Sequence, residues 1–552
     1  MLKLNDFTIL IGGEAGQGTR LAGNLIANIF NKLGYFVYVY EDYQSLIRGG
    51  HNFSEIRVCN EKKISRKEKI DVLIGLDKNT ISLHKSRLSN GDLIIFNGDR
   101  VKGEKGIQVL SDKIVKEEGG IPQMVNVTLI SALVKVLGVP FDILEQVLKE
   151  RIKRGIDLNL KIAKRVYDEV EKKIEVLRLR ENNSILLTGN EATGFGLAIA
   201  GLEFYFAYPM TPLTSLLNFF SQRKNELKVN VFQPESEISV INMALGSAFA
   251  GKRSAVGSSG GGFALMVEAI SLALQAEIPI LIVEGQRAGP STGMPTYNLQ
   301  GDLFFVFGAG HGDIQKVILH PGDAEDCLYL ANLGLNLAWK YQLPVILLTD
   351  KDIAENTFPV YKTMFNKLKK EEAKIFQANE EYLRYKITED GISYLAFPGS
   401  EYIVKVNSYE HDEKGITTED EIICSKMHEK RRKKFETLKK EMETLETVKI
   451  YGNLKSNVAL IPLGICKGVA LEIAEEFGFK VIFPYFLSPF PENKMKEALA
   501  GVEKIYTLEL NSTGQLSTYL KMFDIKAQPI LKYTGRPFIF EELREKFKNY
   551  EI

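Results

Sequence analysis

Residues 203–296 carry the pattern that most restricts how this chain can fold. Within them, loops rich in Gly, Pro, Ser and Thr follow short apolar runs: YPMTPLTS after EFYFA, SSGGG after RSAVG, and GQRAGPSTGMPT after IPILIVE. Helix-like stretches separate the apolar runs, and this alternation is typical of a parallel sheet with helices on both faces. Open sheets of this kind bind ligands at the carboxyl ends of their strands. The loops therefore predict a ligand site at one sheet edge.

The same alternation continues on both sides of this stretch, so we expect an α/β protein with doubly wound parallel sheets. At 552 residues the chain is too long for a single hydrophobic core. The predicted division has an α/β domain at 1–180, a second at 183–355 that contains the loops, a connector with a charged helix at 356–450, and a third α/β domain at 451–552.

Charge and apolar runs limit the kinds of partner. Basic and acidic residues number 70 each, so no net charge favours nucleic acid or an anionic membrane. No apolar run reaches the roughly 18–20 residues that span a bilayer. Because the N-terminus lacks the cleavage site of a signal peptide, we expect a cytoplasmic protein. The basic run KRRKK at 430–434 is interpreted as a solvated helix face balanced by neighbouring acidic residues.

A Gly-rich turn, GGEAGQGT, joins the first apolar strand to a helix. The spacing from Gly13 to Gly18 is that of a phosphate-binding P-loop, but Thr19 stands where the lysine is needed, so nucleotide hydrolysis is disfavoured. Two interpretations stay open. Gly13, Gly16 and Gly18 either serve a tight strand–helix turn or bind an anion or cofactor at the helix N-terminus.

Glu235 and Glu237 open a helix after an apolar strand in FQPESEISVIN. Carboxylates in a first helical turn are commonly explained by the helix dipole alone. A second explanation is cofactor chemistry: in thiamine diphosphate enzymes a glutamate bonds N1′ of the aminopyrimidine and promotes its imino form, which accepts the proton of the reactive carbon. From the spacing alone the dipole explanation is favoured.

The order of motifs along the chain resembles that of the 2-oxoacid:ferredoxin oxidoreductases, specifically an alpha subunit with a fused N-terminal gamma domain. The matching motifs are GGEAGQGT, RGGHNFSEIRV, YPMTPLT, QPESEISVINMALGSAFAG, SSGGG, GQRAGPSTGMPT and ELNSTGQL. The resemblance spans nearly the whole chain. It implies a gamma-type domain, a thiamine diphosphate pyrimidine-binding domain and a transketolase C-terminal-like domain, in that order.

The resemblance also implies roles for individual residues. Glu237, and not Glu235, falls on the glutamate that contacts the cofactor pyrimidine. Thr211 and Arg287 fall on the groups that hold the 2-oxoacid carboxylate, and a guanidinium suits this role because it binds a carboxylate bidentately. Further cofactor-binding positions are Tyr208, Pro209, Ser259 and Gly260. The chain has Gly261 where the family usually has proline and Met210 where it has isoleucine.

Two features of such enzymes are missing from the sequence. It contains no GDG motif followed by asparagine, which would hold the diphosphate and Mg²⁺. Its four cysteines are far apart and form no C-x-x-C pair, so a [4Fe–4S] cluster from this chain alone is not expected. The resemblance places both features on a separate beta subunit. It implies an (alpha–beta)2 assembly that is active only when both subunits are present, with ferredoxin as electron acceptor.

The implied reaction is oxidative decarboxylation of a 2-oxoacid, of the pyruvate or 2-oxoglutarate class, with coenzyme A. The products are acyl-CoA, CO2 and reduced ferredoxin, and the gamma domain is a candidate for binding coenzyme A. Two alternatives remain at this point: a non-redox thiamine diphosphate decarboxylase or transketolase-like enzyme, and a non-catalytic scaffold subunit. The ELNSTGQL turn is interpreted as structural, supporting a subunit contact, rather than catalytic.

Overall fold

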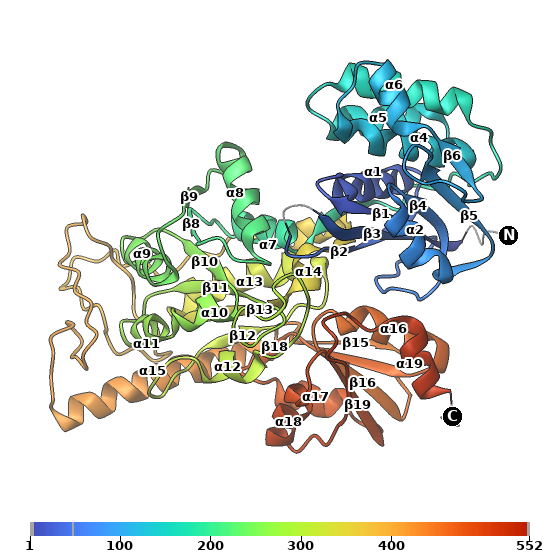
Figure 1. The fold of residues 1–552 in the computed structure, drawn as a ribbon. Coiled ribbons are helices and arrows are strands. Elements are labelled where there is room, and N and C mark those ends of the chain that lie inside the picture. The colour runs from blue at the N-terminus through green and yellow to red at the C-terminus, as the bar shows by residue number, and fades with distance from the viewer. Residues whose placement is uncertain (1–4, 47–48, 549–552) are drawn as a thin grey trace. The chain divides into compact units, whose positions relative to one another are not determined.

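A computed structural model describes residues 5–46 and 49–548 (Figure 1). The chain folds into two compact units. The first contains the described residues up to Leu187, together with Asn356–Lys362 and the residues from Phe538 onward; the second contains Thr188–Glu355 and Thr363–Pro537. Among the described residues, none of the helices has the length and apolar character needed to cross a membrane.

The first unit is built on one eight-stranded sheet. Its strands, in spatial order, are β6 (Ile107–Val109), β5 (Leu88–Asn97), β4 (Ile70–Gly75), β1 (Asp6–Ala15), β3 (Gly49–Cys59), β2 (Phe36–Asp42), β14 (Thr357–Tyr361) and β7 (Ser184–Thr188). Its helices are α1 (Thr19–Lys32), α2 (Lys78–His84), η1 (Lys85–Arg87), α3 (Ser111–Glu117), η2 (Pro122–Met124), α4 (Val125–Val136), α5 (Phe141–Arg151), α6 (Ile156–Glu169) and α19 (Phe540–Phe547).

This sheet is mixed, whereas the sequence predicts parallel strands. β1 runs parallel to β4, but β3 pairs antiparallel with both β1 and β2. The reason is the length of the connection between β2 and β3, which is far shorter than the dozen or more residues that a parallel crossover needs. The α/β class is confirmed, with this antiparallel strand at the centre of the sheet.

The second unit contains a seven-stranded sheet and a five-stranded sheet. The first has the order β18 (Phe486–Ser488), β12 (Val317–Leu319), β13 (Pro344–Asp350), β11 (Ile280–Gln286), β10 (Ser254–Ser258), β8 (Phe204–Phe206) and β9 (Asn230–Phe232). The second has the order β15 (Val448–Gly452), β17 (Lys480–Pro484), β16 (Val458–Pro462), β19 (Lys504–Glu509) and β20 (Gln528–Leu531). All strands of the larger sheet except β18 pair in parallel.

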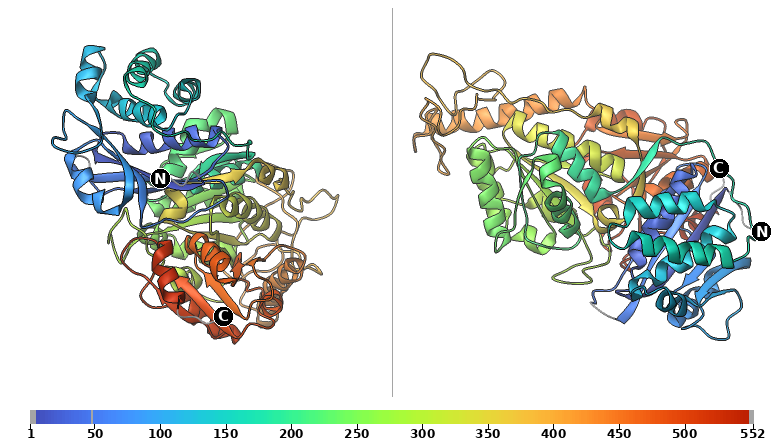
Figure 2. Two further views of the ribbon diagram at one scale, coloured as in Figure 1. Left: turned by 90° about the vertical axis from the view of Figure 1, so that its right-hand side faces the viewer. Right: turned by 90° about the horizontal axis from the view of Figure 1, so that it is seen from above.

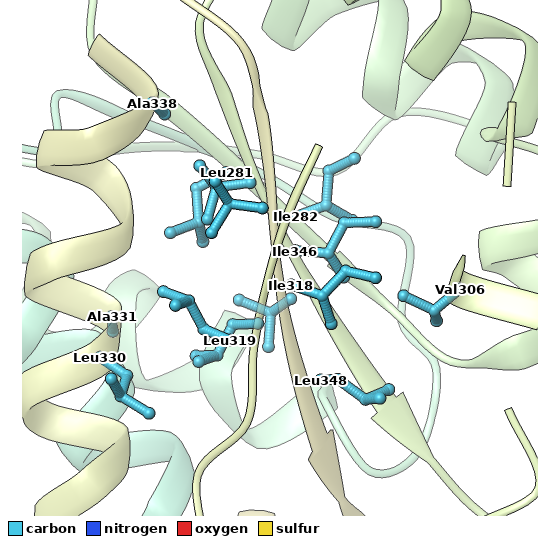
Figure 3. Close-up of a cluster of buried hydrophobic side chains, with 14 of the residues drawn as sticks. Leu281, Ile282, Val306, Ile318, Leu319, Leu330, Ala331, Ala338, Ile346 and Leu348 are labelled. Atoms are coloured by element: carbon cyan, nitrogen blue, oxygen red, sulfur yellow. The ribbon is translucent and has the colours of Figure 1, made fainter. Parts of the chain in front are cut away.

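Helices cover both faces of the seven-stranded sheet, as the alternation predicts. Figure 3 shows Leu281 turned toward Ala338 of α13 (Ala324–Tyr341), while Ile346 lies on the opposite face, where Val306 of α12 (Leu303–Gly308) packs. The other helices of this unit are α7 (Gly189–Ile199), α8 (Thr214–Leu227), α9 (Glu237–Phe249), α10 (Gly260–Ala264), α11 (Val267–Gln275), α14 (Lys351–Glu355), η3 (Lys362–Lys367, at the unit boundary), α15 (Glu421–Met442), α16 (Cys466–Phe477), α17 (Glu492–Ala498), α18 (Gln515–Leu520) and η4 (Lys521–Phe523).

The two sheets of the second unit share one hydrophobic core. A single cluster of buried side chains runs from Tyr205 and Ile282 to Phe483 and Leu516. β18, which comes from the predicted 451–552 domain, pairs antiparallel with β12 of the other sheet. The finer division into domains at 183–355 and 451–552 stays a prediction; within the second unit the two parts are continuous.

The basic run on α15 is only partly a solvated face, which corrects the expectation from the sequence: Arg432 and Lys433 are exposed, but the other three residues are buried. Lys430 and Lys434 are buried, and their ammonium groups bind the two carboxylate oxygens of the buried Glu277 at 2.6 and 2.7 Å. Arg431 pairs with Glu410 at 2.6 Å. Buried charges need such partners, and α15 lies beside α13 of the same unit (Figure 2). The acidic partners are distant in sequence, so local charge balance did not reveal them.

Candidate active site

The three predicted loops meet at one edge of the seven-stranded sheet. β8 pairs with β10, and β10 pairs with β11, all in parallel. In this register Phe206 lies opposite Val256, and Ser258 lies opposite Glu284. Neighbouring parallel strands end on the same side, so the loops that follow them share the carboxyl edge. The sequence-predicted residues of these loops are therefore brought together.

Glu237 is the first residue of α9, directly after the N-cap residue Ser236. It is 5% exposed, and its Oε1 is buried without a hydrogen-bond partner among the described residues. A Cβ built on Gly262 would lie 2.4 Å from this oxygen and 2.1 Å from Ser258 Oγ. The carboxylate thus lies against the Gly-rich segment that begins α10, at a position where only glycine leaves room for it.

Glu235 has a different environment. It is exposed, and its carboxylate accepts a hydrogen bond from Ser239 Oγ one turn along α9. A buried acceptor left without a donor costs about 1–3 kcal/mol. Glu237 carries this cost and Glu235 does not. The two glutamates of the motif therefore differ in burial and in hydrogen bonding, although they are two residues apart in the sequence.

Arg287 and Thr211 are in direct contact. Arg287 Nη1 donates a hydrogen bond to the backbone carbonyl of Thr211 at 3.0 Å. The contact uses the main chain of Thr211 and leaves its hydroxyl out. The adjacent part of the loop is held by Asn190, whose Nδ2 donates to Pro212 O at 2.9 Å and to Ser215 Oγ at 2.6 Å. Asn190 is a positioning residue that the sequence analysis missed.

The remaining predicted cofactor-binding residues fall into an exposed group and a buried group. Tyr208 is 40% exposed and Pro209 is exposed beside it. Ser259 is fully buried as the N-cap residue of α10, and its Oγ has no partner among the described residues. Gly260 follows as the first residue of α10. Ser259 Oγ and Glu237 Oε1 are thus both buried polar atoms that a ligand at this edge could satisfy.

Two acidic residues that the sequence analysis missed belong to the same edge. Glu284 on β11 is completely buried, and neither of its carboxyl oxygens has a partner among the described residues. Burial, with a further contribution from Asp302, raises the pKa of Glu284 well above its ordinary value. Burial also raises the pKa of Asp302 to about 6, opposed by the charge of Arg287. A lone acidic residue ending the apolar run ILIVEGQ was the available signal for Glu284.

The ELNSTGQL turn holds the segment that carries Asp302. Glu509 accepts hydrogen bonds from the backbone N–H groups of Leu516 and Ser517 at 2.8 and 2.9 Å. From this turn Asn511 Nδ2 donates to Gln300 O at 3.1 Å, and Gln515 Nε2 donates to Gly301 O at 2.7 Å. Within the chain these contacts are structural; the predicted subunit contact stays a prediction.

The Gly-rich turn of the first unit is described by itself. Gly16 and Gly18 have φ of +93° and +77°, the left-handed region that favours glycine. Gly13 lies close to the Gln17 side chain, since a Cβ there would be 2.3 Å from Gln17 Oε1. Asn126 is 2% exposed and donates to Gly18 O at 3.3 Å, while its Oδ1 has no partner among the described residues. Backbone geometry accounts for the glycines, and the anion-binding interpretation stays a prediction.

Comparisons with known proteins point to one enzyme family over nearly the whole chain. Residues 196–431 match the family described as pyruvate flavodoxin/ferredoxin oxidoreductase, thiamine diP-binding, and residues 8–169 match the family described as pyruvate ferredoxin/flavodoxin oxidoreductase. The 2-oxoacid:ferredoxin oxidoreductase subunit alpha of a Sulfolobus species is 33% identical over 97% of this chain and 95% of its own length. That of Saccharolobus solfataricus is 31% identical over 98% and 97%.

A solved structure is similar over the same extent. The 2-oxoglutarate:ferredoxin oxidoreductase from Magnetococcus marinus, with 2-oxoglutarate, coenzyme A and succinyl-CoA bound, superimposes with a TM-score of 0.88 at 28% identity. The match covers 99% of this chain and 99% of that chain.

Proposed function

Because this chain belongs to the alpha subunits of the 2-oxoacid:ferredoxin oxidoreductases, we propose that its carboxyl-edge site is one half of a thiamine diphosphate site, completed by a beta subunit. The enzyme is an oxidoreductase that acts on 2-oxoacids. The proposed reaction is coenzyme A-dependent oxidative decarboxylation to acyl-CoA, CO2 and reduced ferredoxin. The observation that carries the proposal is the buried, unpartnered Oε1 of Glu237 at the sheet edge where ligands bind.

The residues present fit the pyrimidine side of thiamine diphosphate. Glu237 Oε1 and Ser259 Oγ are buried polar atoms without partners among the described residues, and Gly262 gives the carboxylate its place. Glu237 would hold a proton at N1′ of the aminopyrimidine and so favour the imino form, while Tyr208, Pro209 and Gly260 line the approach. When bound, the cofactor supplies the nucleophilic carbon and the electron sink for decarboxylation.

Arg287 fits the clamp for the substrate carboxylate. Among the described residues, one of its donors is held by the carbonyl of Thr211, and Asp302 and Glu284 act on it only through their charges, without a hydrogen bond. The remaining donors are free to bind a planar anion in the bidentate way that guanidinium favours. Thr211 then acts mainly as the group that orients Arg287, and its hydroxyl is a second candidate contact to the 2-oxoacid.

Exposed apolar side chains on α9, which begins with Glu237, and at the end of α10 support a partner at this edge. Ile238 and Met243 on α9 are 53% and 43% exposed, and Leu265 at the end of α10 is 50% exposed. Apolar groups gathered beside a site mark interaction surfaces. We propose that the beta subunit docks here and carries the diphosphate and Mg²⁺ site and the [4Fe–4S] cluster. Ferredoxin as acceptor and an (alpha–beta)2 assembly complete the proposal.

The turn with Gly13, Gly16 and Gly18 is the proposed contact for coenzyme A. Backbone N–H groups at the start of α1 suit an anionic group such as a phosphate. The cytoplasmic location rests on the amino-acid sequence alone and stays a prediction.

The decisive experiment compares Glu237→Gln with Glu235→Gln in the complex reconstituted with the beta subunit. We expect Glu237→Gln to lower kcat by on the order of 100-fold or more, because the amide cannot control the pyrimidine proton. Glu235→Gln, two residues away on the exposed side, should retain activity. Measuring 2-oxoacid-dependent ferredoxin reduction with subunit content checked by gel filtration gives the answer. Equal activity of the two variants would refute the cofactor role.

A further inference from the structure

The loop between β11 and α12 begins with Arg287, and hydrogen bonds join its two arms on either side of this residue. Before Arg287, Gln286 Oε1 accepts from the backbone N–H of Asp302 at 3.1 Å. After it, the Ala288 N–H donates to the carbonyl of Tyr297 at 3.0 Å. The main chain at Arg287 is therefore placed by the return arm of the loop, which runs from Tyr297 to Asp302.

Asp350, the last residue of β13, binds two side chains of this return arm. Asn298 Nδ2 donates to its Oδ1 at 3.1 Å, and Gln300 Nε2 donates to its Oδ2 at 2.8 Å. All three side chains are completely buried. A buried polar group left without its partner costs free energy, so these hydrogen bonds hold the arm firmly in one position.

The same carboxylate also binds two turns of the chain. The Ile353 N–H donates to Oδ1 and the Ile465 N–H donates to Oδ2, both at 3.0 Å. A Cβ built on Gly464 would lie 2.3 Å from Oδ2, so the turn between β16 and α16 packs directly against the carboxylate. Burial and the charge of Asp352 raise the pKa of Asp350 to about 6, and the hydrogen bonds that it accepts oppose this. The group is thus mainly ionised at pH 7, and each oxygen accepts two hydrogen bonds.

The return arm has further anchors, which use its main chain. The N–H of Gln300 donates to the carbonyl of Leu510 at 2.7 Å, in addition to the bonds from the ELNSTGQL turn described above. Asp350 differs from these anchors because it belongs to the strand that pairs with β11. In that parallel register it lies opposite Gln286, the residue directly before Arg287. Asp350 therefore fixes the arm against the same sheet edge from which Arg287 emerges.

Resting on the proposed clamp role of Arg287, we propose that Asp350 is a positioning residue for substrate binding: its carboxylate holds the return arm against the sheet edge and thereby holds Arg287 where it meets the 2-oxoacid carboxylate. Asp350 acts through Arg287 and not on the reacting atoms. The 451–537 part of the chain also contributes to substrate binding, because its Ile465 is bonded to the same carboxylate.

Asp350→Asn in the complex reconstituted with the beta subunit tests this role. An amide has one acceptor oxygen, and its N–H2 group would have to face two of the donors that the carboxylate now accepts, so the return arm or the turn must shift. We expect KM for the 2-oxoacid to rise on the order of 10-fold. The kcat of the assembled complex should change by less than about twofold, because a carboxylate clamp binds the ground state and the transition state alike. Steady-state ferredoxin reduction at varied 2-oxoacid concentration measures both quantities.

Glu277→Gln is the matched control, because it alters an equally buried carboxylate shortly before β11, at the opposite end of that strand from the loop. It should lower stability and leave KM unchanged. If both variants raise KM alike, the effect is general destabilisation and the positioning role is wrong. Asn298→Ala is the milder second variant, since Asp350 keeps its other donors. It should raise KM several-fold, and an unchanged KM overturns the proposal even if Asp350→Asn fails to assemble.

Variants of Arg287 separate the possible failures. Arg287→Gln should raise KM far more than it lowers kcat; if KM is unchanged, the clamp itself is wrong and the proposed function must be revised. If Arg287→Gln raises KM while Asp350→Asn and Asn298→Ala do not, only the positioning role is wrong. In the double variant Arg287→Gln with Asp350→Asn, KM should be no higher than in Arg287→Gln alone, because the second change acts through the side chain already removed. Effects that multiply would show independent action and overturn the proposal.

Discussion

Gly262 lies where a side chain would displace the Glu237 carboxylate. Its φ is not in the left-handed region, and helices favour alanine over glycine by about 1 kcal/mol, so Gly262→Ala should fold. Yet the added Cβ would be 2.4 Å from Glu237 Oε1 and 2.1 Å from Ser258 Oγ. The Glu237 carboxylate would therefore have to move away from its present position. Misplacing a catalytic group by about 1 Å lowers activity on the order of 10–100-fold. We predict that loss in kcat/KM, with a melting temperature that is unchanged or lower, because relieving the close contacts offsets the helix propensity of alanine.

Gly261 is the matched control for this prediction. It is the preceding residue of α10, it is exposed, and a Cβ there would meet no atom within 4 Å. Gly261→Ala should therefore keep kcat/KM near the wild-type value. Steady-state kinetics on the two reconstituted complexes and thermal unfolding of the two chains make the comparison. If both variants are equally active, the Glu237 carboxylate does not require the place described above.

Burial explains which residues of the site could be predicted from the sequence. The spacing of QPESE leaves Glu235 and Glu237 equivalent, and only the family resemblance selected Glu237; the structure distinguishes them because one carboxylate is exposed and the other is not. Asp302 and Glu284 escaped prediction because their importance depends on desolvation and on neighbours from separate loops. A local sequence pattern contains neither kind of information.

Among the elements, α15 depends on charges that lie far away in the sequence. Burial alone would raise the pKa of Glu277, but Lys430, Lys434 and Arg384 hold it well below its ordinary value. Glu277→Gln leaves two buried ammonium groups without a counter-charge. We predict a loss of about 3–5 kcal/mol in the free energy of unfolding, the usual cost of breaking a buried pair from one side. Urea unfolding at pH 7 measures it.

The control for Glu277→Gln is an exposed lysine on α15. Lys433 is exposed on α15, so Lys433→Ala should change the free energy of unfolding by within roughly 0.5 kcal/mol. Because the folded-state pKa of Glu277 is depressed, its contribution is present above its ordinary pKa of 4.5 and is lost as the pH falls below that value. Wild-type stability should therefore fall more steeply on acidification than that of Glu277→Gln.

Element prediction succeeded where strands alternate with helices and failed where the chain makes another connection. The parallel strands of the 203–350 region follow from that alternation. The sheets were expected to be parallel, but the short connection between β2 and β3 permits only antiparallel pairing. β18 could not be assigned to its sheet, because its partner β12 is more than 150 residues away in the chain. Long-range pairing leaves little trace in local periodicity.

At the scale of the whole molecule, the proposal is that the chain supplies the pyrimidine and substrate side of a site, and that its exposed apolar side chains mark where a partner supplies the rest. Leu265 is 50% exposed at the end of α10, and Ile238 is 53% exposed on α9 directly after Glu237. Isolated exposed apolar residues are common on protein surfaces, but residues adjacent to buried, unpartnered polar atoms are better explained by a partner that covers both. The proposed partner is the beta subunit.

Leu265→Asp tests this surface directly. A charge at the centre of a docking surface must be desolvated without a partner, so we expect association with the beta subunit to weaken by 100-fold or more, at about 3–5 kcal/mol for an uncompensated buried charge. The chain itself should remain folded, because Leu265 is exposed. Ile403→Asp is the control: Ile403 is 91% exposed on the connector, away from the candidate site in sequence. Co-purification, gel filtration and thiamine diphosphate binding distinguish the variants. Normal assembly of Leu265→Asp would place the beta subunit elsewhere. Loss of both assembly and cofactor binding would connect the docking surface to the site.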